Sequence, residues 1–311
     1  MTTPSTTTTS SPSGVHPSGA PGRGGSLGPV GLVLGAGFSV QFGAALAVSL
    51  MPRAGALGVV TLRLIAAAVV LLVVCRPRLR GHSRADWGTV VVFGVAMGAM
   101  NGLFYQAVDR IPLGAAVTLE VLGPLALSVL ASRRALNAVW AALALGGVVL
   151  LSGGGGFGGL DPVGVAFALG AGAMWATYII FSARTGRRFP QADGLALAMA
   201  VGALLMLPLG VAESGSKLAD PTTIALGSSV AILSSVLPYT FELLALRSLP
   251  ASTFAIMMSL EPALAATAGF LILDQSLSAP QAAAIAMVIA ASMGAVRTQV
   301  GRRKVPSPPE V

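Results

Sequence analysis

Four ionisable side chains lie inside long apolar stretches of the sequence. They are Arg63, Glu120, Glu242 and Glu261, the last within "MMSLEPAL" (257–264). A charge at the centre of a membrane costs about 2.5 to 3.5 kcal/mol on insertion scales, so such residues usually face a cavity and a partner. A carboxyl group holds a proton in a dry cavity and releases it in a wet one. We therefore expect Glu261, Glu120 and Glu242 to couple proton movement to another event.

Arg63 offers the complementary charge. Counted along their apolar runs, Arg63 and Glu120 both lie about 14 Å from the same end, and Glu261 lies only slightly deeper, at about 1.5 Å per residue. A single cavity that holds both signs of charge fits a zwitterion, and we expect Arg63 to pair with the carboxylate of that zwitterion. Two alternatives stay open. Arg63 and one glutamate form a static ion pair that fixes packing, and Glu242, near a helix end, extends to the membrane interface.

A second set of polar and aromatic side chains lies in the same apolar runs. Residues of this kind orient a small ligand in an otherwise apolar pocket, although interhelical packing and interfacial anchoring explain them as well. Two prolines, Pro124 and Pro262, are expected to bend their helices beside the acids and so to provide a gate. The candidate substrate-binding residues of this set are Gln41, Asn101, Tyr105, Trp175, Tyr178 and Tyr239.

The elements that position these residues are transmembrane helices. The chain has 311 residues, of which 54% are hydrophobic and 10% are charged, far from the roughly 25% charged residues of a soluble domain. Crossing a bilayer takes about 20 apolar residues per helix. The apolar runs are continuous, without the alternation of a membrane β-barrel. We predict an all-α integral membrane protein with ten transmembrane helices, at 28–50, 54–75, 86–108, 111–131, 136–152, 161–181, 193–212, 222–246, 251–273 and 278–297.

The ten helices divide into two similar halves. "PVG" occurs at 29–31 and 162–164, and "LGAG" at 34–37 and 169–172. At an offset of 138, "VDRIPLGAAVTLEVLGPLAL" (108–127) aligns with "LRSLPASTFAIMMSLEPALA" (246–265). A five-helix unit ends on the opposite side of the membrane from its start, so the second copy is inverted, as in many secondary transporters. The predicted units are two repeats at 28–152 and 161–297, a glycine-rich linker at 153–160, a disordered tail at 1–27 and a second tail at 298–311.

The positive charges set the orientation. Most of the 19 Lys and Arg residues fall in segments that share a side with the N-terminus, whereas the other side holds only Arg53, Arg110 and Lys217. This bias predicts that both termini are cytoplasmic. It also explains the net charge of +8 without a nucleic-acid partner. His16, His82 and Cys75 form no metal or catalytic motif, so we expect no metal, no cofactor and no enzymatic activity.

Several segments, taken in order, resemble a known family. They are "TLRL" (61–64), "GAMNGLFYQAVDRIPLGAAVTLEVLGPLAL" (98–127), "LGAGAMWATYI" (169–179), "LPYTFELLALRSLP" (237–250) and "MMSLEPALAA" (257–266). This order is similar to the threonine/homoserine exporters, EamA-type members of the drug/metabolite transporter superfamily. The resemblance covers about residues 30–297. It implies two inverted five-helix repeats in the bacterial inner membrane and proton-driven export of small amino acids.

The sequence thus favours a secondary exporter of threonine- or homoserine-like amino acids in exchange for protons, with the amino acid, protons and the lipid bilayer as its partners. The alternative within the same fold is an exporter of hydrophobic drugs or other small metabolites, for which Arg63 would matter little. A passive channel is a third reading. It would not depend on the pH gradient.

Overall fold

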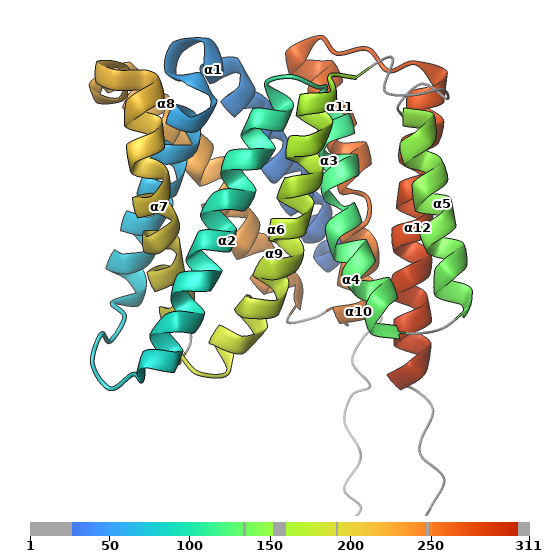
Figure 1. The fold of residues 1–311 in the computed structure, drawn as a ribbon, viewed down its shortest axis with the longest axis horizontal. Helices are drawn as coiled ribbons and strands as arrows, with labels where there is room; N and C mark the ends of the chain where they lie inside the picture. The colour runs from blue at the N-terminus through green and yellow to red at the C-terminus, as the bar shows by residue number, and fades with distance from the viewer. Residues whose placement is uncertain are drawn as a thin grey trace, which may run out of the picture.

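The structure, a computed structural model, describes residues 27–132, 135–151, 160–190, 192–246, 249 and 251–303, and its regular structure in these residues is entirely helical (Figure 1). The first half of the chain contains α1 (Leu27–Cys75), α2 (Arg84–Val108), α3 (Leu113–Glu120), α4 (Leu122–Ser132) and α5 (Ala135–Leu151). The second half contains α6 (Pro162–Gly186), α7 (Asp193–Ser214), η1 (Gly215–Ala219), α8 (Pro221–Ala231), η2 (Ile232–Val236), α9 (Leu237–Leu246), α10 (Ala251–Met258), α11 (Glu261–Leu273) and α12 (Ala279–Arg303).

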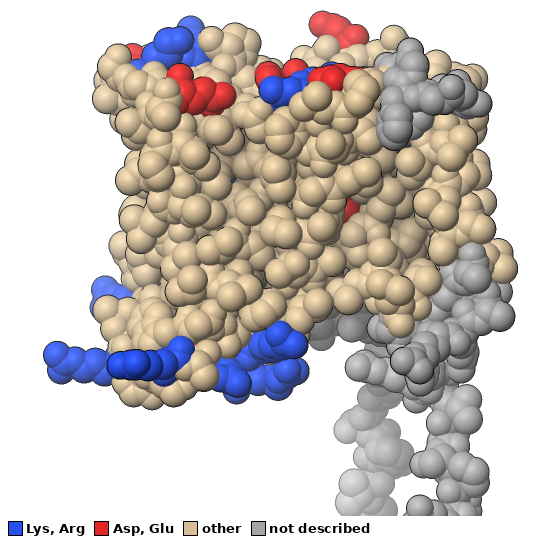
Figure 2. All heavy atoms as spheres, viewed as in Figure 1, with Lys and Arg blue, Asp and Glu red and all other residues tan. Residues whose placement is uncertain are grey.

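The surface of the bundle is that of a membrane protein. Within the described residues, six spans are long and apolar enough to cross a bilayer, and three further apolar helices are shorter. Large apolar side chains such as Val74, Leu130, Leu145 and Leu204 are well exposed. Figure 2 shows a belt with almost no charged atoms, apart from a small acidic spot near its middle, between the charged side chains at the two ends of the molecule. The six spans are Gly28–Cys75, Arg84–Val108, Pro162–Gly186, Asp193–Ala219, Ile256–Leu273 and Ala279–Arg297.

The predicted helices at 28–50 and 54–75 both lie in α1, on either side of a sharp turn. Gly55 has φ 65° and ψ 168°, a backbone conformation outside the helical region that glycine adopts without a steric penalty. The helix then restarts with two N–H groups that lack an intrahelical partner. A carboxylate from α7 accepts both, because Glu213 Oε2 lies 2.6 Å from Leu57 N and 3.1 Å from Gly58 N. α7 thereby holds the turn in place.

Two predicted continuous helices, 111–131 and 251–273, are each broken at one point. The first is divided into α3 and α4 at Val121, and the second into α10 and α11 at Ser259 and Leu260. A proline ring clashes with the carbonyl group four residues earlier. Pro124 therefore ends α3 at Glu120, and Pro262 ends α10 at Met258. The two breaks fall on equivalent positions of the repeat alignment.

The predicted helix 222–246 contains a π-helical turn, η2, between α8 and α9. Leu237 N–H donates to the carbonyl of Ile232, five residues earlier, so the carbonyl oxygen of Leu233 is left out of the ladder. Ser39 on α1 donates its hydroxyl to that oxygen at 2.6 Å. Turns of this kind are rare and often occur at functional sites.

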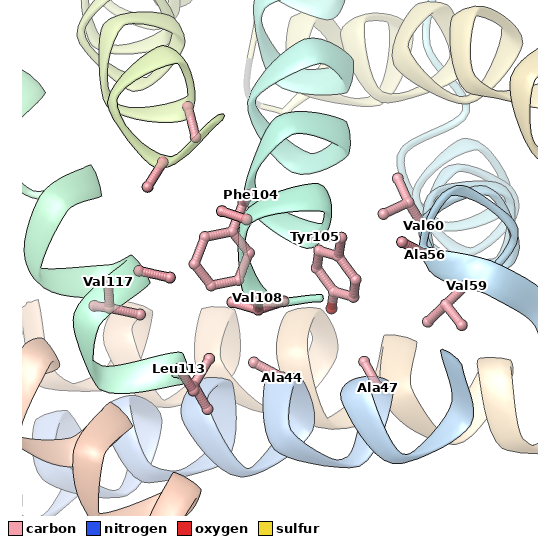
Figure 3. Packing of buried hydrophobic residues seen from close by; sticks show 14 of the residues in the cluster. Ala44, Ala47, Ala56, Val59, Val60, Phe104, Tyr105, Val108, Leu113 and Val117 are labelled. Atoms are coloured by element: carbon pink, nitrogen blue, oxygen red, sulfur yellow. The ribbon is translucent and has the colours of Figure 1, made fainter. Parts of the chain in front are cut away.

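The helices pack in crossed pairs around a core of small and branched side chains. The first part of α1 contacts η2, α9 and α11, its second part contacts α8, and α6 contacts α2, α3 and α4. The second part of α1 packs on α7, where Thr61 Oγ1 donates to Met206 O at 2.9 Å. Figure 3 shows Tyr105 of α2 pointing between the two parts of α1, beside Ala47 and Val60. α5 and α12 pack on each other at one edge of the bundle (Figure 1).

The predicted terminal and linker segments fall mostly outside the described residues. This applies to the tail at 1–27 apart from Leu27, to the linker at 153–160 apart from Leu160, and to the end of the chain after Arg303. α12 continues to Arg303 and is thus longer than the predicted helix 278–297. Its last residues are polar and basic, so hydropathy alone does not detect this extension.

Candidate functional site

A cavity of about 200 Å³ lies between the helices that carry the predicted site residues. Its wall combines side chains from α1, α2, α3, α6, α7, η2, α9 and α11, so both halves of the chain contribute. Eight of the predicted residues line it, namely Gln41, Arg63, Asn101, Glu120, Trp175, Tyr178, Glu242 and Glu261. These residues lie as far as 220 positions apart along the chain.

The charged groups of the cavity form a connected series. Glu120 ends α3 at the first proline break and interacts electrostatically with both Arg63 and Glu261. Glu261 is the first residue of α11, after the second break, and interacts with Glu242 of α9. Glu261 is only 9% exposed. Three carboxyl groups and one guanidinium thus surround a space of ligand size.

Arg63 is fixed by an aromatic partner rather than by an acid. Its Nη1 donates to the hydroxyl oxygen of Tyr105 at 3.1 Å, and its guanidinium carbon lies 5.7 Å from the centre of the Tyr105 ring. Its buried Nε has no hydrogen-bond partner within the described part of the chain. No nitrogen of Arg63 lies within 4.0 Å of a carboxylate oxygen among the described residues. Among the described residues, Arg63 therefore does not form the closed ion pair that the static alternative requires.

Two amide side chains complete the polar wall. Asn101 on α2 is buried, and its Nδ2 donates to the carbonyl of Met97 at 2.9 Å. Gln41 on α1 is 3% exposed, and among the described residues its Oε1 has no hydrogen-bond donor. Trp175 and Tyr178 of α6 add aromatic surface. The ring of Tyr178 lies 5.1 Å from that of Phe93, centre to centre.

Four predicted site residues have other positions. Tyr105 is fully buried and lies behind Arg63, so it supports the cavity instead of lining it. The side chain of Tyr239 lies outside the described residues. Pro124 and Pro262 fall in the first turns of α4 and α11, where they end the preceding helices beside Glu120 and Glu261.

Glu242 lines the cavity instead of reaching an interface. Arg247, five residues further along the chain, lies outside the described residues.

Three residues that were not predicted as site residues also line the cavity, from η2 and α9: Ser234, Ser235 and Pro238. Adjacent serines in an apolar run, four and three residues before the proline, were the available signal. Ser234 donates its hydroxyl to the carbonyl of Val230 at 2.5 Å, so only its lone pairs remain free for a ligand. The other missed lining residues are apolar, and periodicity does not separate them from core residues: Val40, Ala44, Leu64, Met97, Met100, Phe104, Val117 and Met199.

The described residues contain no group of three or more His, Cys, Asp and Glu side chains arranged to hold a metal ion. The cavity combines a guanidinium, carboxyl groups, amides and aromatic rings. Such a set binds a small charged or zwitterionic molecule. Apolar helices around a charged cavity of this size define the protein as a polytopic membrane transporter.

Comparison with known proteins narrows this class. The sequence profile of the EamA-like transporter family matches residues 162–297. The chain is 41% identical over 271 residues to the threonine/homoserine exporter RhtA of Escherichia coli (strain K12), covering 87% of this chain and 92% of that protein. It is 40% identical over 271 residues to RhtA of Salmonella typhimurium (strain LT2), with the same coverage.

A more distant relative is the uncharacterized transporter YwfM of Bacillus subtilis (strain 168), 27% identical over 234 residues, with coverage of 73% and 79%. One solved crystal structure shares the fold, with a TM-score of 0.57 and 21% identity over 88% of this chain and 98% of that one. The chain belongs to the EamA-like transporter family, and the resemblance expected from its sequence segments is confirmed.

Proposed function

We propose that this protein exports small amino acids of the threonine/homoserine type from the cytoplasm in exchange for protons. The observation that carries the proposal is the cavity lined by Arg63, Glu120, Glu242 and Glu261, in which Arg63 forms no closed ion pair with any described residue. An α-amino acid at neutral pH carries one carboxylate and one ammonium group. The cavity offers a guanidinium for the first and carboxylates for the second.

The similarity to RhtA, whose name states export of threonine and homoserine, supports this substrate class. A cavity of about 200 Å³ suits an amino acid with a short side chain. The apolar part of its wall, with Met97, Met100 and Phe104, accommodates the methyl and methylene groups of such a substrate.

Proton coupling follows from competition inside the cavity. In our proposal the amino acid's ammonium and the incoming protons occupy Glu120 and Glu261 by turns, so binding of one displaces the other. The broken helices beside these acids supply the moving parts, because Pro124 and Pro262 interrupt the hydrogen-bond ladders at those points.

In this proposal the chain forms ten transmembrane helices in two inverted repeats of five. Two features support the arrangement. The proline breaks fall on equivalent positions of the two halves, and the contacts of α6 with α2 and α4 mirror those of the first part of α1 with α9 and α11. The end with the exposed Arg76, Arg78 and Arg80 faces the cytoplasm of a bacterial inner membrane, by the positive-inside rule.

The test uses purified protein in liposomes with an imposed pH gradient and labelled threonine. The wild type moves threonine against the proton flow, and Glu261→Gln abolishes this coupled transport. Asp274→Asn is the matched control, because Asp274 is exposed at the end of α11, has φ 52°, and asparagine tolerates that conformation. Coupling that is unaltered in Glu261→Gln would overturn the role of Glu261, and a wild type that never moves threonine would overturn the proposed function.

A further inference from the structure

Gln41 lies in the cavity wall, and among the described residues its buried Oε1 is an unused hydrogen-bond acceptor. The side chain is 3% exposed, lines the cavity from α1, and its Oε1 has no donor within the described residues. Buried polar atoms without a partner are rare, because each one loses its hydrogen bonds to water unless a ligand or an ordered water replaces them. A buried amide oxygen beside a cavity therefore indicates a donor on the molecule that the cavity binds.

The charged ends of an amino acid have other partners. Among the described residues the Nε of Arg63 has no partner, so it is left for the carboxylate, and the three glutamates attract the ammonium. Charge-assisted hydrogen bonds are about twice as strong as neutral ones. The neutral oxygen of Gln41 is thus left for a neutral donor, and on a small aliphatic amino acid the neutral donor is a side-chain hydroxyl.

The π-helical turn η2 also lines the cavity, and the hydroxyl protons of two serines in or beside it are already in use. Ser234 already donates its hydroxyl to Val230 O, and Ser39, two residues before Gln41, donates to Leu233 O. The hydroxyl protons of Ser234 and Ser39 are thus both donated to backbone carbonyl groups in or next to the π-helical turn. A substrate hydroxyl near this turn therefore finds acceptors, of which Gln41 Oε1 is buried and unpaired.

We infer that Gln41 is the residue that selects amino acids with a side-chain hydroxyl, by accepting the hydrogen bond of that hydroxyl. This inference rests on the proposed function and adds the residue that distinguishes its substrates. A site built to bond a hydroxyl disfavours the analogue without it, because the buried acceptor stays unpaired. We expect a preference of about tenfold.

The experiment measures inhibition of labelled threonine transport in liposomes by unlabelled threonine, homoserine and 2-aminobutyrate. Removing the hydroxyl from either threonine or homoserine gives 2-aminobutyrate, so one analogue tests both. The wild type should prefer the two hydroxy amino acids about tenfold over 2-aminobutyrate. In Gln41→Met this ratio should fall to near one, with the affinity for 2-aminobutyrate little changed. Ser49→Ala, which changes an exposed polar side chain of α1 outside the cavity, should keep the wild-type ratio.

The outcomes separate the two proposals. If the wild type transports threonine but does not distinguish it from 2-aminobutyrate, the inference fails whatever the variants do, and the proposed function stands. If Gln41→Met or Gln41→Leu transports and keeps the tenfold preference, the inference likewise fails alone. If the wild type transports none of these amino acids, both fail.

Discussion

Arg63 donates a hydrogen bond to the hydroxyl oxygen of Tyr105 while its Nε remains unpaired beside the cavity, within the described residues. The fully buried tyrosine orients the guanidinium without neutralising it. A carboxylate in place of Tyr105 would satisfy the arginine permanently and leave nothing for a ligand. The positive charge of Arg63 is therefore positioned beside the cavity without being neutralised by Tyr105.

Tyr105→Phe removes this hydrogen bond and keeps the ring that packs beside Ala47 and Val60 (Figure 3). We expect the KM for threonine to rise about tenfold, since hydrogen bonds to charged groups contribute about 1.5 to 3 kcal/mol. The thermal unfolding midpoint in detergent should change little. An unchanged KM would show that Tyr105 does not position Arg63.

Arg63 itself should not be replaceable by another cation. Arg63→Leu is expected to abolish threonine transport, and Arg63→Lys to retain only a small part, because a lysine lacks the planar fork that grips a carboxylate. Initial rates in liposomes, normalised to the amount of reconstituted protein, measure this. Full activity in Arg63→Leu would favour an uncharged substrate such as a hydrophobic drug.

The contact between Gly123 and Gly172 brings α4 and α6 together next to Glu120. A Cβ added at Gly123 would overlap the carbonyl group of Gly172, and one added at Gly172 would lie 2.6 Å from the carbonyl oxygen of Glu120. Gly123→Ala should destabilise the protein by about 1 to 3 kcal/mol through overpacking. It should also lower the transport rate, because the Glu120 backbone must shift.

Gly88→Ala is the matched control for this substitution. Gly88 lies in α2 with no heavy atom within 4 Å of an added Cβ in the described structure, so alanine should be neutral or slightly stabilising. Thermal unfolding of the two variants in detergent compares them directly. Equal stability of both variants would contradict the close α4–α6 contact.

Most of the elements could be predicted from hydropathy, because about 20 consecutive apolar residues have few other uses. What hydropathy could not locate is where a helix bends. The turn at Gly55 depends on Glu213 and Ser214 from α7, more than 150 residues away in the sequence. The breaks before Pro124 and Pro262 were accessible in principle, because the carbonyl that each proline excludes is four residues earlier.

The candidate site, too, could be predicted from the sequence only in part. Charges in an apolar run are conspicuous, so Arg63, Glu120, Glu242 and Glu261 could be selected from sequence, and all four line one cavity. Tyr105 was predicted to bind the substrate, whereas in the structure it contacts Arg63 and is not among the residues that line the cavity. Whether a tyrosine faces a ligand or supports an arginine depends on helix rotation, which composition does not specify. Ser234 and Ser235 were missed because serine is common in membrane helices as a packing residue.

Asp220 gives a pH-dependent prediction at the exposed end of the bundle. It caps α8, and hydrogen bonds from the backbone N–H and the hydroxyl of Thr223, at 2.8 and 2.9 Å, lower the pKa of its carboxyl group below the usual value. A lowered pKa in the folded state means that the stabilisation is complete above about pH 4 and is lost as the pH falls through the lowered pKa.

The corresponding variants are Asp220→Ala and Asp220→Asn. Asp220→Ala should lower the unfolding midpoint at neutral pH, and its difference from the wild type should shrink in acid. Asp220→Asn keeps a capping oxygen and should lose less at neutral pH. Unfolding midpoints in detergent across an acidic pH series test this. A difference between wild type and Asp220→Ala that does not depend on pH would contradict the capping role.

Whether the cavity binds a zwitterion is tested most directly by measuring which charges a ligand needs in order to bind. Calorimetric titration of the detergent-solubilised protein compares threonine with threonine methyl ester, which lacks the carboxylate, and with N-acetylthreonine, which lacks the ammonium. Threonine should bind much more tightly than either analogue, and Arg63→Leu should remove the discrimination against the ester. Equal binding of all three ligands, or binding of the ester alone, would contradict a cavity built for a zwitterion.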